Sequence, residues 1–134
     1  MRAESREGPE HLAPGGEWGR YWEWFCLALF LLLPLDLLTT FGATAIHGLE
    51  AEANPVMRWL LTQSLVVLIV IHLLVLKLVV LTYAGLLRWA ESLNRRAQRQ
   101  TYACIEIWLA GLIGAGIFVV SNNLSVIVFG ASIL

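Results

Sequence analysis

The chain has 134 residues, of which 58% are hydrophobic and 14% are charged, and its formal net charge is −1. Soluble domains are about 45–50% apolar and about 25% charged, so the composition argues against an ordinary soluble domain. The charge balance offers no basic face for nucleic acid, and we expect no such partner.

The N-terminal tail, residues 1–20, mixes charged residues with glycine and proline and has no periodic apolar pattern. This composition predicts a polar tail without a fold of its own. The remaining residues, 21–134, carry three long apolar runs and form the predicted membrane domain.

The first apolar run covers residues 21–47, which is long enough for one membrane-spanning helix. A cleaved signal peptide is the alternative, because Ala43-Thr44-Ala45 resembles a cleavage site. We expect a retained helix, since the run is long for a signal sequence and contains Asp36. Pro34 cannot donate a backbone hydrogen bond, so it predicts a kink and a free carbonyl near Phe30.

A short acidic connection, residues 48–55, separates the first run from the second. Asn54 followed by Pro55 predicts a helix start, because asparagine caps free amides and proline fits the first turn. The second run, residues 56–88, is the most apolar part of the chain and predicts a second span.

The third span is expected over residues 101–121, after an arginine-rich connection. Ser121, Asn122 and Asn123 follow it, and the apolar tail after them is too short to cross a membrane again. The helix either breaks at these polar residues or continues through them. We expect a break or kink, followed by a short helical or irregular tail.

The fold class is therefore an all-α integral membrane protein with three transmembrane helices. Positive charge gathers in the 88–100 connection, whereas the 48–55 connection holds only acidic charges. The positive-inside rule then predicts a cytoplasmic N-terminus and an outer C-terminus. We expect a multipass protein of a prokaryotic cytoplasmic (inner) membrane, with the lipid bilayer as its first partner.

Polar residues inside the first span are the main functional candidates, because burying them in lipid is costly. Spacings of four, four and three residues place Asp36, Thr40, Thr44 and His47 on one helical face. The stripe can form a hydrated pocket that holds a cation or passes protons, or it can join helices by hydrogen bonds. We favour the second interpretation. The polar stripe and outer turn comprise Asp36, Thr39, Thr40, Thr44, His47, Glu52, Asn54 and Pro55.

Depth arithmetic suggests two pairs between helices. Asp36 and His72 both lie roughly 22–24 Å from the arginine-rich end if their helices are straight, so we predict that they pair. Lys77 can pair with Glu106, or it can extend to the lipid headgroups.

No catalytic, metal-binding or cofactor-binding motif stands out. The three histidines fall in separate parts of the chain, and neither a C-x-x-C nor an H-x-x-x-H spacing occurs. We therefore expect no enzyme activity, no metal and no cofactor. Cys26 and Cys104 lie in apolar runs and are expected to be buried free thiols rather than a disulfide.

The third span carries two pairs of small residues at a spacing of four, Ala110 with Gly114 and Gly111 with Ala115. Small residues at this spacing allow another helix to approach closely. The partner helix can come from this chain or from another protein.

A family resemblance rests on an aspartate followed by a threonine pair and on a Glu-x-Asn-Pro turn. Here these are Asp36, Thr39, Thr40, Glu52, Asn54 and Pro55, with Asn122 and Asn123 later in the chain. The chain resembles a family of small prokaryotic membrane proteins catalogued as domain of unknown function 5658. The resemblance implies a compact membrane domain of several helices and no assigned activity.

Two functions fit these features. The first is a non-catalytic accessory subunit of a larger membrane complex, which packs against helices of other subunits. The alternative is a small homo-oligomeric ion or proton transporter that uses the polar stripe. Three helices rarely enclose a path, so the alternative requires self-association.

Overall fold

The structure is a computed structural model, and it describes residues 15–133. Among these residues it is helical throughout, with short turns between helices and no strand. The elements are α1 (Gly15–Phe30), a π-helical turn (Leu31–Leu35), α2 (Asp36–His47), a 3-10 turn (Leu49–Ala51), α3 (Pro55–Leu61), α4 (Leu65–Glu91) and α5 (Arg95–Phe129).

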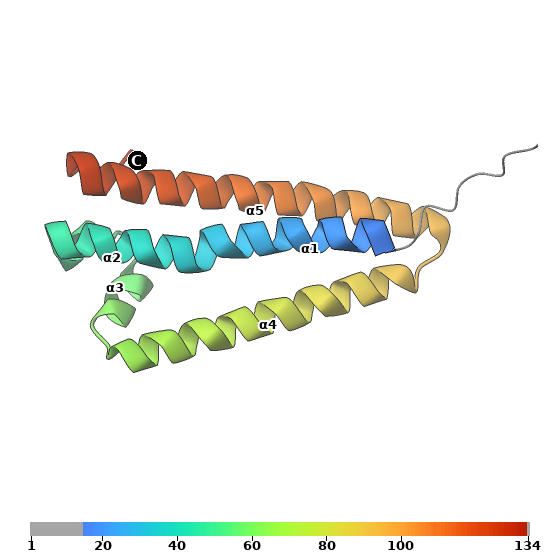
Figure 1. Cartoon of the computed structure of the whole chain (residues 1–134), viewed down its shortest axis with the longest axis horizontal. Helices are drawn as coiled ribbons and strands as arrows, with labels where there is room; N and C mark the ends of the chain where they lie inside the picture. The colour runs from blue at the N-terminus through green and yellow to red at the C-terminus, as the bar shows by residue number, and fades with distance from the viewer. Residues whose placement is uncertain (1–14, 134) are drawn as a thin grey trace, which may run out of the picture.

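Three helical segments are long and apolar enough to cross a membrane, as predicted: Gly19–His47, Leu65–Glu91 and Arg95–Phe129. The first is a continuous rod made of α1, the π-helical turn and α2. This rod lies alongside α5, whereas α4 approaches α1 near the α4–α5 connection and diverges toward the other end (Figure 1).

The π-helical turn lies where the sequence predicts a kink. Pro34 is inside it, and the backbone N–H of Asp36 donates to the carbonyl of Leu31, five residues earlier. The i to i+5 hydrogen bonds of this wider turn let the helix continue past Pro34, which has no backbone N–H to donate. Gly116 of α5 packs against this turn, because a Cβ added there would lie 2.7 Å from Leu31 Cβ.

The predicted second span is wrong at its start, because the helix divides into α3 and α4. Asn54 caps α3 as predicted, and its side chain accepts hydrogen bonds from the amides of Val56 and Met57. Thr62 then ends α3 by donating 2.7 Å to the carbonyl of Trp59, and Ser64 caps α4. These polar side chains replace the missing backbone partners, so the chain can turn between the two helices.

The predicted break in the third helix is also wrong. The helix begins at Arg95, where Asn94 accepts a hydrogen bond from the amide of Ala97, and it continues to Phe129. Asn122 and Asn123 do not interrupt it, because their side chains bond to groups outside their own turn rather than competing for its backbone. Gly130 then ends α5 in the left-handed conformation, with φ of 68°.

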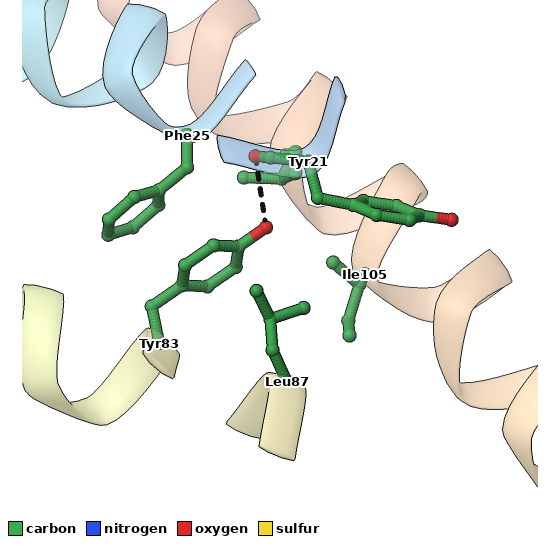
Figure 2. Close-up of a cluster of buried hydrophobic side chains, with 6 residues drawn as sticks. Tyr21, Phe25, Tyr83, Leu87 and Ile105 are labelled. Carbon is green, nitrogen blue, oxygen red and sulfur yellow. Dashed lines mark hydrogen bonds between the residues drawn. The ribbon is translucent and has the colours of Figure 1, made fainter. Parts of the chain in front are cut away.

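The main core lies where α1, α4 and α5 converge near the α4–α5 connection. Figure 2 shows the ring of Tyr83 stacked on Phe25, with ring centroids 3.9 Å apart, and its hydroxyl donating 3.2 Å to the carbonyl of Tyr21. The buried cluster consists of Tyr21, Phe25, Tyr83, Leu87, Ile105 and Leu109. Away from this cluster α4 is largely uncovered, since only 6% of its most apolar 18-residue stretch is buried inside the chain.

Both cysteines are free, but they are exposed on the helix surfaces rather than buried. Cys26 and Cys104 occupy helix faces that the rest of the described chain does not cover. In a chain with so few helices, an apolar sequence position is therefore a poor guide to burial inside the protein.

Candidate functional site

A polar cluster joins α5 to α2 inside the apolar segments. The side-chain nitrogen Nδ2 of Asn123 donates 2.9 Å to Asp36 Oδ1 and lies 3.1 Å from both Thr39 Oγ1 and Thr40 Oγ1. Thr39 and Thr40 are buried. An amide nitrogen carries two hydrogens, so three acceptors share two donors. The cluster brings together three of the predicted polar residues around one that the sequence placed outside the third span.

The threonine hydroxyls use their own protons locally. Thr39 Oγ1 donates to the carbonyls of Leu35 and Asp36, and Thr44 Oγ1 donates to the carbonyls of Thr40 and Phe41. Thr39 can therefore act only as an acceptor toward Asn123. The predicted common face of Asp36, Thr40 and Thr44 is present, and its hydrogen-bonding groups are satisfied within α2 and by α5.

A small cavity of about 70 Å³ adjoins the cluster, between α2, the connection after it and α5. This volume exceeds what one ordered water requires. The polar residues that line it are Thr40, Thr44, Glu52, Asn122, Asn123 and Ser132. The cavity lies where the less favoured interpretation of the stripe, a hydrated pocket, would require one.

The predicted outer turn builds a helix start, and only part of it reaches the cavity. Glu52 Oε1 accepts 2.7 Å from the backbone amide of Asn54, and the carbonyl of Glu52 accepts from Arg58 Nε and Nη2. Asn54 faces its own helix as a cap, and Pro55 is the first residue of α3. His47 is exposed and lies beside Gly130, where an added Cβ would come within 3.4 Å of its Cε1.

The C-terminal turn closes one side of the cavity, and no sequence pattern predicted it. Asn122 Oδ1 accepts 2.7 Å from Ser132 Oγ and 2.9 Å from the backbone amide of Ile133. Ser125 Oγ donates 2.9 Å to the carbonyl of Ala131. The tail therefore folds back onto the last turns of α5 instead of extending away.

The predicted Asp36–His72 pair does not form within the described residues. Asp36 bonds to Asn123 instead, and His72 Nδ1 lies 2.9 Å from the carbonyl of Leu68 in its own helix. The depth arithmetic assumed parallel helices. Because α4 diverges from α2, similar depth does not bring these two side chains within hydrogen-bonding distance.

The predicted Lys77–Glu106 pair is also replaced. Glu106 Oε1 accepts 3.0 Å from Arg20 Nη2 and 3.0 Å from the Tyr21 hydroxyl, because its side chain faces α1. Lys77 is exposed on α4. Among the side chains that the structure describes, residues 19–133, no group of three histidine, cysteine, aspartate or glutamate side chains gathers as a metal site would require.

The small residues of α5 divide into two faces. Ala110, Gly111, Gly114 and Ala115 are all exposed, and a Cβ added at Gly111 or Gly114 would meet no atom within 4 Å. The close approach inside the chain instead uses Gly116, against the π-helical turn. The small-residue pairs predicted from the sequence are therefore not used by the described part of this chain.

Of three comparisons with known proteins, one finds a match, and it is to a protein family. No curated protein and no solved structure matches the chain. A family model matches residues 27–129, a range that includes the polar cluster, the outer turn and the small-residue face. The chain therefore belongs to the family described as Domain of unknown function (DUF5658).

Proposed function

We propose that the chain is a non-catalytic accessory subunit of a larger membrane complex, and that α5 packs against a helix of another subunit. The observation that carries this proposal is the open space beside Gly111 and Gly114. Glycine gives a membrane helix no side chain to pack against lipid, and its advantage is close approach by another helix. Here no helix of the described chain takes that position.

The exposure of α4 supports the same proposal. The most apolar 18-residue stretch of α4 is 6% buried inside the chain, compared with 22% for the corresponding stretch of each of the other two segments. Apart from a few polar positions such as the exposed Lys77, α4 is apolar around its circumference and packs on almost none of it, which suits lipid or a large apolar partner. We assign the face of α4 around Gly85 to lipid, which leaves the small-residue face of α5 for the partner helix.

Matched glycine variants test the proposal. Gly114→Leu fills the small-residue face, whereas Gly85→Leu adds the same bulk on α4, where the space is equally open. After gentle extraction from the native membrane, Gly114→Leu should lose its partner subunits while Gly85→Leu retains them. Both variants should melt within a few degrees of the parent chain. Retention of the same partners by both variants would contradict the proposed interface.

The topology forms part of the proposal: N-terminus in the cytoplasm, C-terminus outside, in a prokaryotic cytoplasmic membrane. The arginine-rich α4–α5 connection lies at one end of the helices and the α2–α3 connection at the other (Figure 1). In a chain without Cys26 and Cys104, a cysteine substituted for Glu50 should react with an impermeant maleimide from outside, and one substituted for Ser92 should not. The reverse pattern would invert the proposed topology.

A small transporter is the second candidate, favoured by the polar cavity beside Asn123. Its oxygen-rich lining, with Glu52 at one side, suits a hydrated cation or a proton path. Reconstituted homo-oligomers should then carry a cation flux that Asp36→Asn abolishes without unfolding the chain. Unchanged flux in that variant would remove this candidate.

A further inference from the structure

An open, charged hollow lies at the arginine-rich end, between the beginning of α1 and the beginning of α5. Its volume is about 980 Å³. Its charged lining consists of Arg20, Glu91, Arg95, Arg96, Arg99 and Glu106. Four guanidinium groups face two carboxylates, so the lining carries a formal charge of +2.

The negative charge of Glu106 is already compensated, since Arg20 and the Tyr21 hydroxyl each donate 3.0 Å to its Oε1. The three arginines of α5, by contrast, are exposed, and no ion pair within 4 Å is recorded for them among the described residues. Guanidinium groups bind phosphate oxygens through paired N–H donors. The hollow therefore has the charge and the donors to bind a phosphate group.

An apolar groove of about 390 Å³ adjoins this hollow and runs along the seam between α1 and α5. The two share Arg20, Tyr21 and Glu106 at their boundary. Beyond that boundary the groove is lined by Trp24, Ile107, Leu109 and Ala110. Trp24 and Ile107 are exposed, so the groove opens outward along the helices.

A basic hollow that opens into an apolar groove matches the two parts of one phospholipid. Basic pockets between membrane helices bind anionic headgroups, and a groove along two helices accommodates an acyl chain. We propose that this composite site binds one anionic phospholipid, with its phosphate among Arg95, Arg96 and Arg99 and one acyl chain beside Trp24 and Ala110. The site rests on the proposed membrane placement, and because Ala110 also belongs to the small-residue face of α5, the site is tested on the isolated chain without partner subunits.

The test is native mass spectrometry of the isolated full chain in a neutral detergent. The probes are phosphatidylglycerol and phosphatidylcholine with identical acyl chains, supplied in equal amounts. The parent chain should retain one phosphatidylglycerol about fivefold or more in preference to phosphatidylcholine. Arg99→Gln should lower that preference about fivefold, which is the effect of one basic group near an anionic lipid.

Arg88→Gln is the matched control, because Arg88 is exposed at the same end but does not line the hollow. It should leave the preference unchanged. Equal loss in both arginine variants would overturn the proposal, since the attraction would then be diffuse. Equal retention of the two lipids by the parent chain would also overturn it.

Two further arms test the groove and the phosphate source. Ala110→Phe fills the groove and should lower retention of both lipids while the chain keeps its melting temperature; unchanged retention would overturn the acyl-chain assignment. Inorganic phosphate should not displace phosphatidylglycerol, and displacement at comparable concentration would indicate a phosphate site without lipid. Recovery of the chain outside the membrane fraction would instead refute the proposed membrane placement, which is a separate result.

Discussion

Asn123 Nδ2 donates a hydrogen bond of 2.9 Å to Asp36 Oδ1 and so joins α5 to α2 across 87 positions of the chain. The same nitrogen reaches two buried threonines of α2. Hydrogen bonds between buried side chains of two helices are directional, so the cluster fixes how the two helices are aligned along their lengths. The polar cluster thus has a structural role whether or not the adjoining cavity binds anything.

Removal of the amide should weaken the fold. Asn123→Ala removes the amide that donates to Asp36, and we expect a loss of about 0.6–2 kcal/mol, the range found for hydrogen bonds between membrane helices. Asn122→Ala is the neighbouring control, since its oxygen bonds only the C-terminal turn. Unfolding in detergent, followed by circular dichroism, measures both. A larger loss for Asn122→Ala would contradict the assigned role of Asn123.

The contact between Gly116 and the π-helical turn predicts a second effect. A methyl group at position 116 would lie 2.7 Å from Leu31 Cβ, so the two helices must move apart to admit it. Gly116→Ala should therefore destabilise the chain by about 1–3 kcal/mol. Gly111→Ala adds the same group in open space and should cost nothing measurable. Equal melting temperatures for the two variants would refute the close approach.

The core hydroxyl of Tyr83 predicts a third effect. Tyr83→Phe removes the bond to the carbonyl of Tyr21 but retains the stacking on Phe25, so a loss of about 1 kcal/mol is expected. Tyr83→Ala also removes the ring and should cost about 3–5 kcal/mol. Denaturation of both variants in the same detergent gives the comparison. Losses of similar size would mean that the ring contributes little.

The ion pair between Arg20 and Glu106 should contribute little to stability. Its side chains are 56% and 52% exposed, and exposed pairs contribute about 0–1 kcal/mol. Glu106→Gln should therefore shift the unfolding free energy by less than about 1 kcal/mol, and by less still at high salt. Denaturant titration of the variant and the parent chain at two salt concentrations measures this difference in unfolding free energy. A large, salt-independent loss would show that the pair is buried in the membrane protein as it exists in lipid.

The sequence was sufficient to predict the three spans, because each depends on local apolar length alone. It also predicted a face shared by Asp36, Thr40, Thr44 and His47, of which the first three lie at the polar cluster and its cavity while His47 lies beside Gly130. The cap formed by Asn54 was predicted from local hydrogen bonding. These features need no knowledge of neighbouring helices. The family match over residues 27–129 agrees with the motif from which the resemblance was drawn.

The partners of Asp36 and Glu106 could not be predicted in the same way. Pairing by depth requires the start and direction of each helix, and α4 diverges while α5 extends at both ends. Asn123 therefore lies inside the third helix, opposite Asp36, rather than beyond its end. Likewise, small-residue spacing indicates that close packing is possible, but it does not distinguish Gly116, which packs within the chain, from Gly114, which does not.

The proposed subunit role depends most directly on what occupies the open face of α5. Mass analysis of the gently extracted complex tests it in one measurement, with a photoreactive phenylalanine derivative substituted for Phe118, which is exposed on α5 one turn beyond Gly114. The account predicts a distinct partner polypeptide in fixed ratio, cross-linked at position 118 and not when the same residue replaces Leu81 of α4. Cross-links only to other copies of this chain, in a complex without other polypeptides, would contradict it.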